Sequence, residues 1–506
     1  GSLPSFQKIL GGDDECKANT VFFDRATTIF PSVTLVGHAS IFTGVYPGQH
    51  GIAGNQWFDR VGDAFKPNFI PNNPFDYMHV CPQLCIYATQ PPLTSEMKEV
   101  VFLECRSLHS KQNELLSCTE PSPAGLVNKH LKAQTIYEAA GEAGKSSTVI
   151  FSQYWKGVPE DKVVHPDQDE QYLYGLTETK FLPKSENFGE FDRGMMLHAI
   201  NKVRSEGIPD ILTVYFSGLD ATGHMLGIHS HAEYLSKSID PPVGGLLIEL
   251  KKQDKNWCKD TLFVVTADHG QKHIDPTNEA SLSLVKSTLN KAGFKNNYVV
   301  AVNGGMAHVY LKNGSTLNWP DPPRFDKDVI PAAEALCGAM DERQLWKILV
   351  RGPDGNYKVY RADRKKGKGK KEVCETAGIV ELTGDQELKS GEGLNVIDLI
   401  NGLNSKRSGD ILILLMSSSY FEHREIFKWG NKADHGSLHE GGLRVPIVLA
   451  GGGVSLNPEG CKHINAKNRC DDVVRTVNIV RTIARYLGFE DKLKEAEGAL
   501  PVKFLE

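Results

Sequence analysis

The segment Leu262-Phe-Val-Val-Thr-Ala-Asp-His-Gly270 joins an apolar, β-branched run to two side chains that can bind a metal ion. A second apolar run, residues 211–216, precedes Asp220-Ala-Thr-Gly-His224, and a third motif, Asp434-His435-Gly436, lies ahead of the apolar run at residues 445–449. Short apolar runs are typical of strands buried in a parallel sheet, and open α/β sheets place their active sites at the ends of such strands. The sequence therefore predicts an α/β fold whose polar motifs meet at one edge of the central sheet.

Helix-like segments alternate with these runs. Residues 128–144 have helical character and lead into the apolar run at residues 147–151, and residues 191–204 carry apolar side chains at helical spacing ahead of the run at 211–216. Residues 473–487, followed by Gly488, predict a last helix. Because this alternation is typical of βαβ units, we expect a doubly wound, mostly parallel central sheet with helices on both faces.

Two stretches interrupt the alternation. Residues 59–125 hold four cysteines and several prolines, and predict an excursion over the active-site face. The segment between Gly270 and Asp434 is far longer than the roughly one dozen residues that a crossover connection needs. We therefore divide the chain into a catalytic core at residues 1–311 and 409–506 and an inserted cap subdomain at residues 312–408. The basic run at residues 364–371 favours a solvated hairpin tip over a substrate contact.

Composition and charge narrow the class of protein. Of the 506 residues, 40% are hydrophobic and 24% are charged, as in ordinary soluble globular proteins. A net charge of −5 gives no general attraction to nucleic acid, so we expect no binding to a nucleic acid duplex. No segment approaches the roughly eighteen consecutive apolar residues of a membrane-spanning helix, so we expect no transmembrane segment in this chain. The oligomeric state is left open.

The cysteines bear on the cellular compartment. Ten are present, with two local groups: Cys81, Cys85, Cys105 and Cys118 in one segment, and Cys461 and Cys470 beside a short polar loop. No Cys-x2-Cys pair occurs, so this clustering favours disulfides over zinc ligands. We expect an extracytoplasmic location, which means secreted, periplasmic, at a cell surface or lumenal, with any signal or anchor outside the given chain.

A candidate nucleophile lies in Phe30-Pro-Ser-Val-Thr34-Leu-Val-Gly-His38, where the hydroxyl of Thr34 comes just before a stretch that can start a helix. A threonine hydroxyl is a poor nucleophile at neutral pH unless a metal, a base or a helix N-terminus activates it. Two divalent ions roughly 3.5–4 Å apart can do so. The carboxylate and imidazole groups of the three motifs are the ligand mixture that suits zinc.

In this order the motifs resemble the alkaline phosphatase superfamily, and most closely its type I phosphodiesterase/nucleotide pyrophosphatase branch. The similarity includes Thr43-Gly-Val-Tyr-Pro-Gly-Gln-His-Gly-Ile52 after the nucleophile segment, and extends from about residue 3 to the end of the chain. The resemblance implies a metal-dependent hydrolase that cleaves phosphodiester or pyrophosphate bonds of small phosphate esters through a phosphothreonine. A sulfatase is disfavoured, because no Cys-x-Pro-x-Arg or Ser-x-Pro-x-Arg motif is present.

The resemblance also implies a role for each residue. Thr34 would be the nucleophile on a site of two zinc ions. One ion would be held by Asp220, His224 and His435. The other would be held by Asp268, His269 and the oxygen of Thr34.

The chain departs from the family pattern at two places. An aspartate of an Asp-Gly pair that precedes the nucleophile in the family has no counterpart, because Thr34 lies too close to Gly1. We expect that aspartate and its strand to precede residue 1; the alternatives are Asp13 or Asp14 in its place, or an incomplete second metal site. Gly37 stands where nucleotide pyrophosphatases have an asparagine that binds phosphoryl oxygens. The backbone N–H of Thr34 and the side chain of Asn55 are the candidate substrate-binding groups instead.

Other interpretations stay open. A phosphomonoesterase or phosphonate hydrolase of the same superfamily would share every ligand named above. A pseudoenzyme that binds a ligand through an incomplete metal site is a second alternative. Taken singly, Asp-His-Gly is a common turn and Asp220 with His224 is an ordinary pair on one helical turn, so the interpretation rests on their joint order. His273 and His439, which flank two of the motifs, are expected to face solvent.

Overall fold

The structure is a computed structural model, and it describes residues 2–10, 20–60, 68–70, 130–166, 185–366, 372–381, 396–421, 432–461, 463, 470 and 472–504. Most of the expected excursion at residues 59–125 lies outside these ranges, and so do its four cysteines and the pair Asp13 and Asp14. Within the described part of the chain, no helix is both long enough and apolar enough to cross a membrane.

Two three-stranded sheets carry the motif strands. In the first, β5 (Val163–Val164), β4 (Ser147–Ile150) and β6 (Ile211–Val214) lie side by side and parallel, with Ser147 opposite Ile211. In the second, β18 (Ile447–Gly451) lies between β1 (Thr20–Phe22) and β7 (Leu262–Thr266) and is antiparallel to both. The predicted α/β class is thus confirmed, and the parallel pairing is that of β4, β5 and β6.

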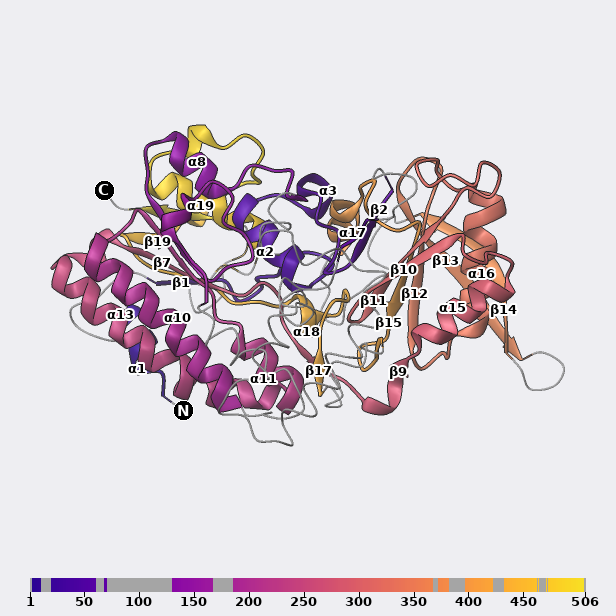
Figure 1. Cartoon of the computed structure of the whole chain (residues 1–506), viewed down its shortest axis with the longest axis horizontal. Coiled ribbons are helices and arrows are strands. Elements are labelled where there is room, and N and C mark those ends of the chain that lie inside the picture. Colours follow the sequence, from indigo (N-terminus) through magenta and orange to yellow (C-terminus); the bar gives the residue numbers. More distant parts are fainter. Residues whose placement is uncertain are drawn as a thin grey trace, which may run out of the picture.

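Helices cover both faces of this region (Figure 1). On one face lie α1 (Pro4–Ile9), α10 (Ser185–Glu206) and α13 (Asp240–Gln253), and on the other lie α2 (Thr34–Thr43), α8 (Ile136–Glu142) and α19 (Ile479–Tyr486). Successive strand residues point to opposite faces, and β4 follows this rule: Ile150 packs in a cluster with α10 and α13, whereas Val149 packs with α8 and α19. Burial on both faces explains why β4 is continuously apolar after Thr148.

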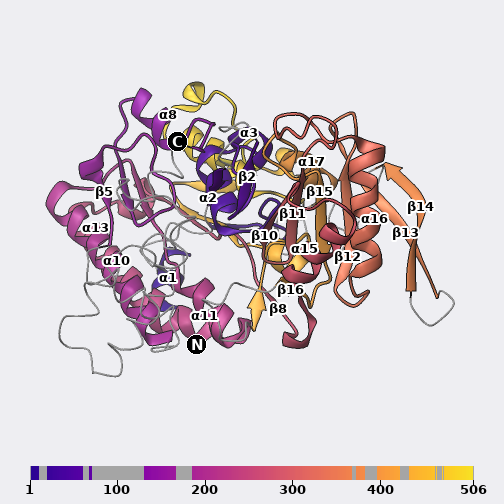
Figure 2. The same cartoon turned by 45° about the vertical axis from the view of Figure 1, so that its right-hand side comes forward.

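A six-stranded antiparallel sheet forms the second half of the molecule (Figure 2). Its strands, in spatial order, are β10 (Tyr298–Asn303), β11 (Met306–Leu311), β15 (Ile411–Leu415), β12 (Leu345–Arg351), β13 (Tyr357–Lys366) and β14 (Glu372–Glu381). Strands β12 to β14 come from the expected cap, whereas β10, β11 and β15 lie outside its sequence limits. The division of the chain at residues 312–408 stays a prediction.

The two halves of the molecule share the central strand β15. Ile411, Ile413 and Leu415 pack against α15 (Leu282–Lys291) and α16 (Ile330–Ala339). The alternate residues Leu412 and Leu414 face the cluster that contains Val36 and Ala39 of α2. Helix α2 is therefore packed between the strands that bear the motifs and the six-stranded sheet.

Short elements complete the chain and bring the motifs together. The strand β17 (Ala433–Asp434) pairs with β8 (Lys272–His273), which places the third motif beside the second. The remaining elements of four or fewer residues include α3 (Pro47–His50), β2 (Trp57–Asp59), β3 (Asn68–Ile70), α12 (His231–Tyr234), α14 (Trp257–Asp260), β9 (Glu279–Ala280), β16 (Tyr420–Phe421), α18 (Glu440–Leu443), β19 (Val454–Leu456) and β20 (Val502–Phe504). Two longer helices are α11 (Gly218–Leu226) and α17 (Ile397–Leu403).

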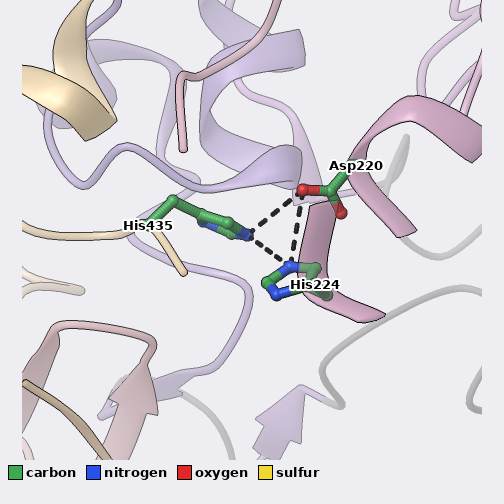
Figure 3. A group of neighbouring side chains, drawn as sticks. All are labelled: Asp220, His224 and His435. Carbon is green, nitrogen blue, oxygen red and sulfur yellow. Dashed lines mark hydrogen bonds and ion pairs between the residues drawn. The ribbon is translucent and has the colours of Figure 1, made fainter. Parts of the chain in front are cut away.

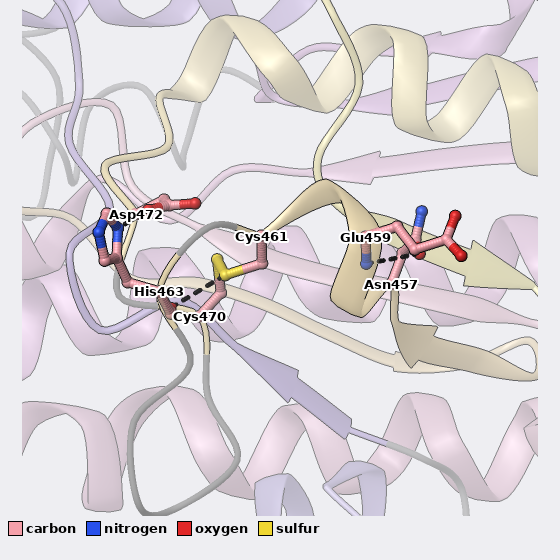
Figure 4. Close-up of a disulfide and its surroundings, with 6 residues drawn as sticks. All are labelled: Asn457, Glu459, Cys461, His463, Cys470 and Asp472. Atoms are coloured by element: carbon pink, nitrogen blue, oxygen red, sulfur yellow. Dashed lines mark hydrogen bonds and ion pairs between the residues drawn. A yellow bond between two sulfur atoms is a disulfide. The ribbon is translucent and has the colours of Figure 1, made fainter.

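Cys461 and Cys470 form a disulfide between β19 and α19 (Figure 4). Beside it, the imidazole of His463 forms an ion pair with Asp472, with 2.6 Å between Nδ1 and Oδ1. The cross-link encloses the short polar loop noted in the sequence.

Candidate metal and active site

Thr34 is presented at the start of a helix that is otherwise inside the protein. It is the first residue of α2 and is half-buried, while residues 35–40 behind it are all buried. Gly37, one turn further, packs directly on the loop of the second motif, because an added Cβ would overlap the carbonyl oxygen of Asp268. That close approach explains why residue 37 of this chain is a glycine, and it brings Thr34 to Asp268 and His269.

Asp220, His224 and His435 converge on one point (Figure 3). Asp220 and His224 share a face of α11 because they are four residues apart. His224 Nε2 lies 3.4 Å from Asp220 Oδ1 and 3.2 Å from His435 Nε2, and His435 Nε2 lies 3.7 Å from the same carboxylate oxygen. One ligand atom from each residue lies within 4.8 Å of the others, as a shared metal ion requires.

Both imidazoles of this group are oriented by hydrogen bonds to backbone carbonyls. His224 Nδ1 is 2.7 Å from the carbonyl oxygen of Ala433, and His435 Nδ1 is 3.0 Å from that of Ser32. A carbonyl only accepts, so each Nδ1 carries the proton that it donates, and Nε2 is the nitrogen left to bind a metal. The Gln271 amide donates to the carboxylate and to the carbonyl oxygen of Asp220, which fixes the third ligand.

The charges of the group are set by burial and by one another. Burial opposes ionisation of Asp220, but the neighbouring His224 and His435 hold its pKa well below the usual range. Burial lowers the pKa of His224, yet the Asp220 carboxylate outweighs it and raises that pKa to about 9. Burial and the nearby His269 lower the pKa of His435 to about 3. The group thus combines an ionised carboxylate with a neutral imidazole, and a divalent cation bound there would replace the proton on His224.

Thr34, Asp268 and His269 form an adjoining group. Thr34 Oγ1 is 3.2 Å from His269 Nε2, and the same nitrogen is 3.3 Å from Asp268 Oδ2. Within the described part of the chain, Asp268 Oδ2 is buried and has no hydrogen-bond partner. The His269 and His435 rings stack with 3.7 Å between their centroids, which joins this group to the first. A buried carboxylate oxygen without a hydrogen bond is costly unless a cation meets it, so these residues fit a second metal ion.

His38 and Asn55 lie near the candidate nucleophile, Thr34. His38 Nε2 is 3.5 Å from Asp268 Oδ2, and burial lowers the pKa of His38, so its imidazole is neutral. Asn55 uses its carbonyl oxygen to accept the backbone N–H of Leu35 at 2.9 Å. This bond caps the first turn of α2 and places Asn55 beside Thr34, but a contact of Asn55 with substrate remains a proposal.

Three site neighbours had no signal in the sequence. The Asn303 side chain accepts the N–H groups of Asn55 and Gln56, and Gly305, two residues further along the same turn, donates its N–H to the carbonyl oxygen of His435 at 2.8 Å. The turn of Asn303 joins β10 to β11, which pair as an antiparallel hairpin. The second neighbour, Gln271, is distinguished by nothing except its place after Asp268-His269-Gly270.

Lys272 is the third such neighbour. Its ammonium donates to the carbonyl oxygens of Met416, Ser417 and Ser419, and burial lowers its pKa to about 8. It therefore ties the loop after β15 to the ribbon of β8 and β17. A lysine is ordinarily exposed, so no sequence pattern predicts this burial.

The two flanking histidines differ from each other. His273 is exposed, as expected. The expectation that His439 faces solvent is wrong: its Nε2 is 2.7 Å from the carbonyl oxygen of Leu415, its ring packs on Trp346, and burial lowers its pKa to about 4.

This chain is similar to several known proteins. A 30-residue stretch is 63% identical to alkaline phosphatase PafA of Elizabethkingia meningoseptica, and it covers 6% of this chain and 6% of that protein. Murine ectonucleotide pyrophosphatase/phosphodiesterase 5 has a similar solved structure, with a TM-score of 0.53, 15% identity, and coverage of 99% of this chain and 92% of that one. The human protein gives a TM-score of 0.53 and 15% identity, with coverage of 98% and 92%. At this identity the structural likeness is one of fold.

The family model for type I phosphodiesterases/nucleotide pyrophosphatases matches residues 1–438. That span contains all six candidate metal-binding residues, Thr34 among them, and it includes most of the elements that position them. The chain therefore belongs to the type I phosphodiesterase/nucleotide pyrophosphatase family.

Proposed function

We propose that this protein is a metal-dependent hydrolase that cleaves phosphodiester or pyrophosphate bonds through a phosphothreonine at Thr34. The observation that carries the proposal is the placement of the Thr34 hydroxyl. The hydroxyl belongs to a half-buried residue at the start of a helix whose next six residues are buried. It lies 3.2 Å from His269 Nε2 and beside a group whose three ligand atoms converge. Family membership supports the class of reaction.

Two divalent ions fit the two groups, and zinc suits their carboxylate and imidazole ligands best. Asp220, His224 and His435 would hold one ion. Asp268, His269 and Thr34 Oγ1 would hold the other. Bound there, the ions would act as Lewis acids that lower the pKa of the threonine hydroxyl and offset charge on the phosphoryl oxygens.

The side chains of the protein would then carry out two displacements. In the first, Thr34 Oγ1 gives up its proton and attacks phosphorus; a bond from Oγ1 to phosphorus forms, and the leaving group departs with the electron pair of its own bond. In the second, water attacks the same phosphorus, the bond to Oγ1 breaks, and Thr34 regains a proton. The backbone N–H of Thr34 and the side-chain amide of Asn55 would donate to the phosphoryl oxygens.

The substrate class follows from the family and from a neighbour. An inactive threonine-to-alanine variant of the murine protein was solved in complex with AMP, with a TM-score of 0.54 and 14% identity to this chain. We propose that the present protein likewise acts on a small nucleotide-like phosphate ester. Binding to a nucleic acid duplex is not expected.

A phosphomonoesterase is the second candidate, because the stretch shared with alkaline phosphatase PafA favours it. The deciding experiment measures turnover of bis-p-nitrophenyl phosphate, p-nitrophenyl phosphate, a nucleoside triphosphate and phosphonoacetate, together with zinc content. Diester or triphosphate cleavage with about two ions per chain supports the proposal. Preference for the monoester supports the second candidate, preference for phosphonoacetate supports a phosphonate hydrolase, and a protein without turnover and with one ion or none is a pseudoenzyme.

We further propose an extracytoplasmic location. The disulfide of Cys461 with Cys470 supports it, because disulfides persist in oxidising compartments. Reduction should loosen the loop between β19 and α19, and limited proteolysis with and without a reducing agent tests that expectation.

A further inference from the structure

A buried carboxylate sits under the helix that carries two of the candidate ligands. Asp192 lies on α10 and is fully buried. It accepts the backbone N–H of Ser217 at 3.2 Å and that of Gly218 at 3.1 Å. These N–H groups belong to the N-terminus of α11, whose first turn has no capping side chain of its own. The carboxylate of a distant helix therefore takes the place of an N-cap residue.

A third donor also forms a hydrogen bond with the Asp192 carboxylate. The hydroxyl of Tyr234, on α12, donates to Asp192 Oδ2 at 2.7 Å. An added Cβ at Gly218 would overlap that hydroxyl, so only glycine allows the three segments to meet. Every hydrogen bond that the described residues make with the Asp192 side chain comes from a donor. A carboxylate can accept them all, whereas an amide must turn its NH₂ group toward at least one donor.

The position of α11 matters because the three residues of the proposed ion-binding group come from separate segments of the chain. Asp220 and His224 lie on α11, while His435 lies in the loop after β17. Metal–ligand distances tolerate changes of only about 0.2 Å, so a small displacement of the helix separates its two ligands from the third. At its other end α11 is held by His224, whose carbonyl oxygen accepts the N–H of Lys432 at 2.9 Å.

We propose that Asp192 is a positioning residue that fixes the N-terminus of α11 and thereby sets the affinity of the Asp220, His224 and His435 group for its metal ion. The inference rests on the proposed metal-dependent function. It concerns one ion of the two, because the hydrogen bonds described for the Asp192 side chain go to the start of α11 and to α12, and neither element carries Thr34, Asp268 or His269.

The chain offers a matched control. Asp240 is a second buried carboxylate that accepts N–H groups at the N-terminus of a helix, with Ser5 N and Phe6 N each 3.0 Å from its Oδ1. That helix, α1, carries none of the candidate ligands. Asp192→Asn and Asp240→Asn thus make the same chemical change at similar places, and only the first should alter the metal site. Tyr234→Phe removes a single donor and leaves the backbone contacts in place.

The test measures zinc binding to the metal-stripped full chain by competition with a chromophoric chelator, alongside thermal unfolding. We expect Asp192→Asn to weaken one of two zinc sites by about tenfold or more, as loss of an orienting partner commonly does. Tyr234→Phe should weaken the same site less, and Asp240→Asn should leave both affinities unchanged. If Asp192→Asn does not fold, Tyr234→Phe against Asp240→Asn decides.

Equal zinc affinities in the variants that replace Asp192 or Tyr234 and in Asp240→Asn would overturn the inference while leaving the proposed function intact. If Asp220→Ala in an otherwise unchanged chain removes no zinc, both the inference on Asp192 and the proposed function are overturned. The two failures are therefore distinguishable.

Discussion

The candidate site has two halves, the group of Asp220, His224 and His435 and the group of Thr34, Asp268 and His269. They differ in how fully hydrogen bonds hold their side chains in place. In the group of Asp220, His224 and His435, both imidazoles are fixed by backbone carbonyls and the carboxylate is fixed by Gln271. In the group of Thr34, Asp268 and His269, one carboxylate oxygen is buried without a hydrogen bond, and a hydroxyl takes the place of a third strong ligand. Under the proposed function, the first half would hold its ion with ligands that are already fixed, whereas the second would present the nucleophile and would need an ion to complete it.

The largest expected effect comes from the nucleophile. Thr34→Ala should lower turnover by several orders of magnitude while changing fold and zinc content little, because the hydroxyl is proposed to form the covalent intermediate and the carboxylates and imidazoles are proposed to hold the ions. Steady-state kinetics and metal analysis of the same preparation measure this. Thr43→Ala is the control: its hydroxyl lies on the same helix, donates to the carbonyl oxygen of Ala39, and is remote from the site. Near-normal turnover of Thr34→Ala would show that another group attacks phosphorus.

The next effect distinguishes the halves by metal content. Asp220→Ala and His435→Ala should each lose one zinc ion and most activity, since a site with three protein ligands has little redundancy. Elemental analysis after dialysis gives the count. Two tightly bound ions in both variants would show that these residues do not share an ion.

Sequence patterns identified the strands ahead of the motifs because these strands are short, continuous apolar runs, although β6 and β7 are only partly buried. The runs at residues 147–151, 211–216 and 262–266 became β4, β6 and β7 with ends shifted by at most two residues. The run at 445–449 became β18 at Ile447–Gly451, because Pro446 has no N–H to give to a ladder. The helix expected at residues 128–144 is, in the described part of the chain, α8, which begins at the capping box of Thr135 and Glu138.

The supporting contacts of the site were beyond sequence patterns because they join residues far apart in the chain. Asn303 reaches Asn55 across 248 positions, and Lys272 reaches Ser417 across 145. Asp192, on a helix whose existence was predicted, showed no sign of its contact with Gly218. Side chains that bind metal ions have a recognisable chemistry, whereas side chains that hold a backbone in place can be any polar residue that the fold brings there.

A smaller effect concerns the relative affinities of the two halves. Zinc titration of the metal-stripped protein should show a tight and a weaker site, and Asp268→Ala should abolish the weaker one alone. The reason is that Asp268 and His269 are the only charged or imidazole ligands described for that half, against three in the other. The control is Asp275→Ala, whose carboxylate caps a short turn outside both groups. Loss of the tight site in Asp268→Ala would reverse the comparison between the halves.

The smallest expected effect tests why the group of Asp220, His224 and His435 should bind zinc more tightly than the other group. The reason proposed is that hydrogen bonds hold its ligands in place before the ion binds. Gln271→Ala removes the amide that donates to Asp220 but leaves all three ligands, so it should weaken the tight zinc site by about tenfold and leave the weaker site unchanged. Gln271 also contacts His231, with 3.1 Å between Oε1 and Nε2, so His231→Ala is the matched variant that disturbs Gln271 without touching Asp220. Competition titrations of the two variants should give a graded loss, larger for Gln271→Ala. If neither variant changes the tight site, the ligands of that half position themselves, and the difference between the halves comes from ligand number alone.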